Sequence, residues 1–126
     1  MLRVPGNKIL IALAVLFLSV QGVYALNEKK IVAYPVPFNP DRQTLKIGYV
    51  GVTPDSLTKV KIEIFDINGD RVYSYEQTSL TTPIIWNGRN STGRIVKTGM
   101  YIIKIVIEDS NTGDHGKKII RSLVNR

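Results

Sequence analysis

The sequence of 126 residues contains no cysteine and only one histidine, His115. Disulfides, lipid anchors attached to cysteine and metal sites built on thiolates are therefore excluded. One histidine also excludes a metal site that pairs two histidines. A folded domain of this chain must be stabilised by packing rather than by disulfides.

The sequence has few features that point to catalysis. No glycine-rich loop precedes a helical pattern, so nucleotide binding has no support. Ser110 and Ser122 offer hydroxyls for a catalytic triad with His115. An exposed position in a turn explains His115 better than a catalytic role does. We predict no enzyme activity and no catalytic, cofactor-binding or metal-binding residues. The alternative is a small hydrolase or carbohydrate-binding protein on the same scaffold, which requires a concave site with clustered carboxylates or aromatics.

A short acidic segment resembles the start of a calcium loop. Asp66, Asn68 and Asp70 occupy its first, third and fifth positions, but arginine then stands where glycine is needed and glutamine replaces the bidentate glutamate. The pair Asn68-Gly69 between two alternating runs instead predicts a β-hairpin with a type I′ turn. A weak calcium site at the protein surface is the alternative interpretation of this segment.

Residues 1–25 have the pattern of a secretory signal peptide. A short basic head is followed by a twelve-residue apolar run from Ile9 to Val20 and by the small-x-small ending Val23-Tyr24-Ala25. This run is short for a membrane span but suits a signal peptide cleaved after Ala25, with an uncleaved anchor as the alternative. We predict an exported mature chain, residues 26–126, in the periplasm, at the cell surface or outside the cell, without a stable membrane span.

Acidic residues are fewer than basic ones. The chain has 17 basic and 10 acidic residues, a formal charge of +7, and loss of Arg3 and Lys8 with the signal would leave +5. The charged residues near the end of the chain are mostly basic, and they include Lys117, Lys118 and Arg121. Such an end suits nucleic acid, anionic lipid or lipopolysaccharide, but a solvated face explains it more simply, and predicted export argues against nucleic acid.

Short apolar runs with a period of two dominate residues 26–126. No stretch has a convincing helical period, and turn residues separate the runs. These features predict an all-β fold, a single antiparallel immunoglobulin-like β-sandwich of about seven strands. The predicted strands are 31–34, 45–49, 60–64, 71–75, 83–86, 101–107 and 117–124.

Two irregular stretches have predictable structural roles. The prolines of residues 35–40 favour a stiff extended segment from which Val36 and Phe38 pack against the body. In residues 86–101, the indole N–H of Trp86 requires an acceptor in the adjoining loop, and Tyr101 is suited to a tyrosine corner. The three glycines of this stretch, at positions 88, 93 and 99, indicate positive φ or close backbone approach.

Three motifs carry a resemblance to a known family. They are Tyr34-Pro35-Val36-Pro37-Phe38-Asn39-Pro40, Asp66-Ile67-Asn68-Gly69-Asp70-Arg71-Val72, and Trp86-Asn87-Gly88-Arg89 followed by Gly93-Arg94 and Gly99-Met100-Tyr101. Together they resemble the immunoglobulin-like domain of flagellar hook-capping proteins and of the C-terminal sorting domains of type IX secretion. The resemblance implies that Gly99, Tyr101 and the terminal residues 117–124 match what a sorting machinery recognises.

One strand is apolar on both faces. Opposite its core face, residues 100–108 present Met100, Ile102 and Val106, either sheltered by long neighbouring side chains or forming a contact surface. With the basic end of the chain, this is our candidate partner surface. We predict a non-catalytic exported module that acts through protein contacts in secretion, attachment or assembly. A hook-cap-like or filament subunit that self-assembles is the alternative.

Overall fold

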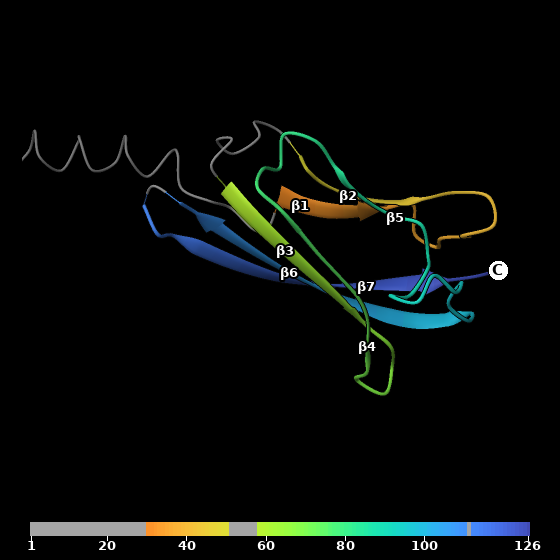
Figure 1. The fold of residues 1–126 in the computed structure, drawn as a ribbon. Coiled ribbons are helices and arrows are strands. Elements are labelled where there is room, and N and C mark those ends of the chain that lie inside the picture. Colours follow the sequence, from red (N-terminus) through yellow and green to blue (C-terminus); the bar gives the residue numbers. More distant parts are fainter. Residues whose placement is uncertain (1–29, 51–57, 111) are drawn as a thin grey trace, which may run out of the picture.

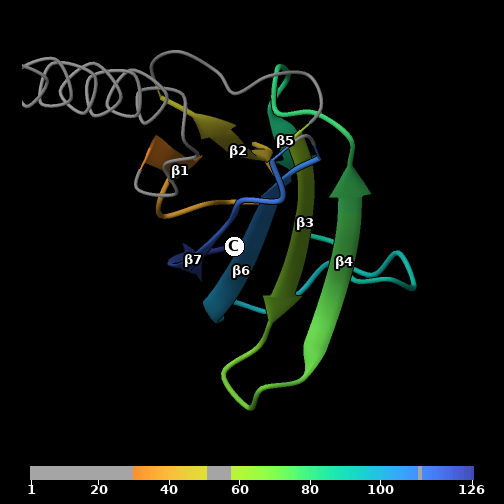
Figure 2. The same cartoon turned by 90° about the vertical axis from the view of Figure 1, so that its left-hand side faces the viewer.

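The computed structural model describes residues 30–50, 58–110 and 112–126. These residues form seven β-strands in two sheets and no α-helix. The two sheets lie one above the other as the layers of a sandwich (Figure 1), and the view turned by 90° in Figure 2 shows β3 and β4 of the larger sheet side by side. The predicted all-β antiparallel sandwich of about seven strands is confirmed. The predicted signal peptide, residues 1–25, lies outside the described residues.

Three strands form one sheet and four form the other, and every strand pairing is antiparallel. The smaller sheet has the order β1-β2-β5 and the larger sheet the order β4-β3-β6-β7. The strands are β1 (Ile31–Tyr34), β2 (Leu45–Tyr49), β3 (Thr58–Phe65), β4 (Arg71–Gln77), β5 (Ile84–Trp86), β6 (Gly99–Asp109) and β7 (His115–Val124). In constant-type immunoglobulin domains the fourth strand joins the sheet of the first, second and fifth. Here a tight hairpin holds β4 against β3 instead.

The larger sheet follows directly from the alternation in its sequence. Val60, Ile62 and Ile64 of β3 are buried. They lie directly opposite buried isoleucines at positions 107, 105 and 103 of β6. Because side chains alternate between the two faces of a strand, this register places a continuous apolar row against the smaller sheet.

The aromatic centre of the sandwich is Trp86, at the end of β5. Its side chain is fully buried, and its ring centroid lies 5.8 Å from Phe38, 6.3 Å from Tyr73 and 6.0 Å from Tyr101. These three rings come from the proline-rich segment, from β4 and from β6. One side chain of the smaller sheet therefore packs against both layers.

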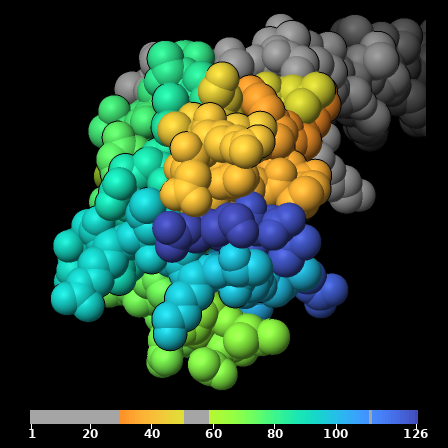
Figure 3. Space-filling view, turned by 90° about the vertical axis from the view of Figure 1, so that its right-hand side faces the viewer, coloured from red at the N-terminus to blue at the C-terminus, as the bar shows by residue number. Residues whose placement is uncertain are grey.

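The proline-rich segment lies against the end of the chain. The N–H of Phe38 donates to the carbonyl of Leu123 at 2.8 Å, and the N–H of Asn125 donates to the carbonyl of Phe38 at 2.9 Å. Figure 3 shows the yellow-orange segment directly against the deep-blue C-terminal residues. Phe38 is fully buried as predicted, whereas Val36 is 51% exposed. The prediction that Val36 packs against the body is wrong, because Phe38 alone points into the core.

The hairpin between β3 and β4 exists, but its predicted turn type is wrong. Gly69 has a φ of 86°, whereas no non-glycine residue among those described has a positive φ. A type I′ turn requires positive φ at both Asn68 and Gly69. The carboxylate of Asp66 instead accepts the backbone N–H groups of Asn68 at 2.9 Å and Asp70 at 3.0 Å. These bonds favour a right-handed turn that ends on a left-handed glycine.

Candidate functional site

The loop after Trp86 is held by its own hydrogen bonds. The indole N–H of Trp86 donates to the carbonyl of Arg89 at 2.9 Å, which is the acceptor that the sequence analysis required. The guanidinium of Arg89 donates to the carbonyl of Gly93 at 2.8 Å, and the N–H of Val96 donates to the carbonyl of Gly88 at 2.8 Å. These three hydrogen bonds give the signature residues of the loop a structural role.

Gly88 provides the close approach between this loop and the proline-rich segment. It has a φ of 75°, and a Cβ placed there would lie 2.5 Å from the Cβ of Pro40. Asn39 shapes the preceding turn, because its carbonyl accepts the N–H groups of Arg42 at 3.1 Å and Gln43 at 2.9 Å. The matching motifs around Pro40 and Gly88 thus meet in space.

Tyr101 has the hydrogen bond of a tyrosine corner. Its hydroxyl donates to the carbonyl of Lys97, four residues upstream, at 2.8 Å. Burial raises the pKa of the Tyr101 hydroxyl above its ordinary value, and the negative charge of Asp66 adds to this rise. Gly99 begins the same strand, β6. Both residues that the resemblance associates with sorting therefore lie at the start of β6.

The outer face of β6 and β7 brings together apolar and basic side chains. Met100 lies directly opposite Leu123, and Ile102 lies opposite Arg121. Met100 and Leu123 are 40% and 39% exposed. We call this region the β6–β7 outer face; its members are Met100, Ile102, Lys104, Val106, Lys117, Ile119, Arg121 and Leu123. It is an exposed apolar strip with cations interspersed.

The charges on this face are partly compensated. Glu63 of β3 lies 3.2 Å from the guanidinium of Arg71 and 4.0 Å from the ammonium of Lys104. Lys117 and Arg121 are exposed and face the same side from the edge strand β7. The uncompensated positive charge therefore concentrates on β7.

Five of the six residues predicted for a partner surface share this face, and Lys118 does not. Its ammonium donates to the carbonyl of Ile31 at 2.6 Å, across the gap between the two sheets. Lys118 therefore connects β7 to β1 instead of facing outward. Val106 is half-buried between Lys61 and Lys117, its neighbours on β3 and β7. Long side chains thus shelter Val106, whereas Met100 keeps substantial exposure.

Leu123 and Ile119 belong to the same strip but were not singled out from the sequence. Ile119 is 51% exposed and lies opposite Lys104. The alternation of Ile119, Arg121 and Leu123 places these three residues on one face of the strand. The sequence does not show that this face is the outer one, because the other face also carries the apolar residues Ile120 and Val124.

Of the two serines considered for a hydrolytic triad, Ser122 does not lie beside His115. His115 begins β7 and is exposed opposite Glu108. Ser122 is fully buried on the other face of the same strand. Within the described ranges, no group of three or more histidine, cysteine or acidic residues is positioned to hold a metal ion. The described residues contain no helix that is long and apolar enough to cross a membrane.

Comparison with known proteins gives structural likeness only. No family model and no curated protein matches the sequence. The structure is similar to part of PorZ, a bacterial surface component of the type IX secretion system of Porphyromonas gingivalis, with a TM-score of 0.53 and 23% identity over 78% of this chain. It is also similar to part of dimeric latent PorU from the same bacterium, with a TM-score of 0.54 and 19% identity over 75% of this chain.

The sandwich fold is shared. The match spans 12% of PorZ and 9% of PorU, so this chain corresponds to a small part of each.

Proposed function

We propose that this protein is a non-catalytic, exported module that acts through protein contacts in secretion, attachment or assembly. The observation that carries the proposal is the β6–β7 outer face. It combines exposed Met100 and Leu123 with the outward cations Lys117 and Arg121 on one edge of the sandwich. Exposed apolar strips with charged neighbours are typical of surfaces that bind other proteins.

Two further observations support a role in secretion. The sequence motifs resemble the sorting domains of type IX secretion, and the fold is similar to part of PorZ, a surface component of that system. The stretch that the resemblance associates with sorting, residues 117–124, lies within β7 and supplies half of the β6–β7 outer face. The proposed contact surface and the stretch associated with sorting therefore overlap on β7.

Localisation in a bacterium with a type IX system tests this proposal. We expect the unaltered chain at the cell surface or in the medium, detected with an antibody raised against the folded protein. The double variant Met100→Ser/Arg121→Glu removes one apolar contact and reverses one charge. We expect it to reach the surface at about one fifth of the normal amount or less, since interface residues of this kind contribute most of the binding energy.

The matched control is Ile85→Ser/Arg94→Glu, which makes the same kinds of change elsewhere. Ile85 is 55% exposed on the smaller sheet, and Arg94 is exposed in the loop after β5. Both variants are first shown to be folded by circular dichroism. Equal delivery of the two variants, or retention of the unaltered chain in the cytoplasm, contradicts the proposal.

Assembly into a filament or cap is the second candidate, because the exposed apolar strip offers self-contact as well. Its test is light scattering coupled to size-exclusion chromatography at high protein concentration. Assembly predicts a mass that rises with concentration and falls in Met100→Ser/Arg121→Glu. A constant monomer mass counts against it.

A further inference from the structure

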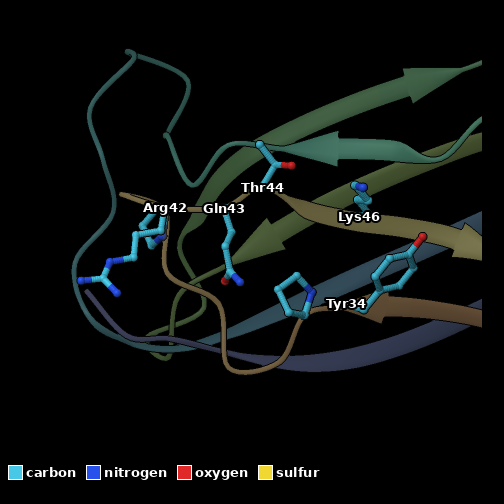
Figure 4. A pocket seen from close by; sticks show the side chains of 7 residues that line it. Tyr34, Arg42, Gln43, Thr44 and Lys46 are labelled. Atoms are coloured by element: carbon cyan, nitrogen blue, oxygen red, sulfur yellow. The ribbon is translucent and has the colours of Figure 1, made fainter.

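A second surface lies on the smaller sheet, away from the β6–β7 outer face. It is formed where the proline-rich segment connects β1 to β2. An open depression of about 600 Å³ is lined there by Tyr34, Pro35, Pro40, Arg42, Gln43, Thr44 and Lys46. Its volume is in the range of small-ligand sites. In Figure 4, Tyr34 and Lys46 stand beside each other on neighbouring strands, and Arg42 extends away from them at the far end.

The frame of this depression is fixed by backbone pairing. Tyr34 and Lys46 are directly opposite each other in the ladder between β1 and β2. The side-chain oxygen of Gln43 accepts the N–H of Asn39 at 3.4 Å, which leaves the amide NH₂ of Gln43 as a donor. The depression therefore presents side-chain donors from a backbone that strand pairing holds at Tyr34 and Lys46.

The charge of the lining has one sign. Arg42 and Lys46 are the charged residues among its described lining residues, none of which carries a carboxylate. The acidic residue next to it, Asp41, has its carboxylate 3.3 Å from the guanidinium of Arg126. Because this acid is paired elsewhere, the depression keeps a net positive charge and favours an anionic ligand.

Tyr34 supplies an apolar surface within this cationic site. It is 47% exposed. It also lines a smaller depression of about 170 Å³, together with Val32, Gly48 and Pro83. The ring therefore stands between two hollows. The face of an aromatic ring carries partial negative charge, which attracts the electropositive C–H groups of a sugar ring.

We propose that this site binds an acidic saccharide, with a sugar ring stacked on Tyr34 and its carboxylate at Lys46. Gln43 and Thr44 supply an amide and a hydroxyl for the sugar hydroxyls, and Arg42 lies where a second acidic unit of a chain would extend. A neutral sugar leaves the cations without a partner, and a free carboxylate leaves the aromatic ring unused. This site is independent of the β6–β7 outer face.

The experiment is a titration of the protein, purified from cells that express the full chain, followed by NMR and calorimetry. The probes are a hexamer of galacturonic acid, a neutral hexamer of glucose and sodium acetate. We expect saturable binding of the acidic hexamer below about 5 mM, with the strongest shifts at Tyr34, Gln43 and Lys46. We expect the neutral hexamer to bind about tenfold more weakly, because it lacks the charge-assisted contact.

Matched variants separate this site from general charge attraction. Tyr34→Ala and Lys46→Gln should each weaken binding of the acidic hexamer about tenfold. Tyr75→Ala and Lys61→Gln alter an exposed tyrosine and an exposed lysine of the larger sheet and should leave affinity unchanged. The proposal is overturned by no saturable binding, by equal affinity for the neutral hexamer or acetate, or by equal loss in the control pair.

Discussion

The indole nitrogen of Trp86 lies 2.9 Å from the carbonyl oxygen of Arg89, three residues further along the chain. This bond closes the loop after β5 onto the ring that forms the centre of the core. The same ring contacts Phe38 and Tyr101, so the loop, the proline-rich segment and β6 are fixed by one side chain. Two of the three signature motifs, the proline-rich segment and residues 86–101, thus meet at Trp86.

Replacing Trp86 with phenylalanine tests this convergence. The variant loses the bond to Arg89 and leaves a void, so we expect the free energy of unfolding to fall by about 2–4 kcal/mol. Urea denaturation measures the change. Ile85→Ala, on the same strand but 55% exposed, should cost under about 1 kcal/mol. A loss in Trp86→Phe no larger than in this control would show that the ring is not central.

Gly88→Ala tests the close approach to Pro40. The added methyl group would lie 2.5 Å from the Cβ of Pro40, on a backbone with a φ of 75°. We expect a loss of about 2–4 kcal/mol in stability, from strain and from displaced packing. Gly93→Ala is the matched control, since Gly93 has a φ of 85° and no atom of the described residues lies within 4 Å of the added methyl group. It should lose only about 1 kcal/mol, and equal losses would refute the steric explanation.

Tyr101 predicts a pH dependence of stability at high pH. Its pKa is raised in the folded protein by burial and by Asp66. The unfolded chain therefore releases this proton first, at about pH 10. The contribution of this pKa difference to the free energy of unfolding is complete below about pH 10 and is lost as the pH rises through the pKa of Tyr101 in the folded protein. Tyr101→Phe should lower stability by about 1 kcal/mol at neutral pH, through the lost bond to Lys97.

The same variant should also show a shallower decline of stability above about pH 10 than the unaltered protein. Urea denaturation at several pH values measures both slopes. Parallel slopes would mean that Tyr101 titrates alike in the folded and unfolded chains.

Ser122 is a polar residue whose removal should not harm the fold. It is fully buried opposite Tyr101, and its hydroxyl has no hydrogen-bond partner among the described residues. Because burial of an unsatisfied hydroxyl is costly, we expect Ser122→Ala to leave stability unchanged or to raise it by up to about 1 kcal/mol. Thermal unfolding measures this change, and a clear decrease would indicate that the hydroxyl has a partner in the folded protein.

Local pattern was enough for most strands. The alternation at Val60, Ile62 and Ile64 predicts both the strand and its buried face, because only one face is apolar. β7 is different, because Ile119 and Ile120 lie on opposite faces of the strand. The sequence alone therefore does not show which face of β7 is buried. Pairing with β6 settles it, placing Arg121 outward and Lys118 toward β1. A shift of one residue in register exchanges the two faces.

The sequence by itself determined the all-β class, the approximate strands and the structural roles of Trp86 and Tyr101, because these depend on period two and on the polar groups of buried aromatics. Only the tertiary structure decided which side chains share a surface. Met100 meets Leu123 through strand register, and Tyr34 meets Lys46 through another ladder. Contacts between residues distant in sequence depend on how the sheets pair, which short-range patterns do not specify.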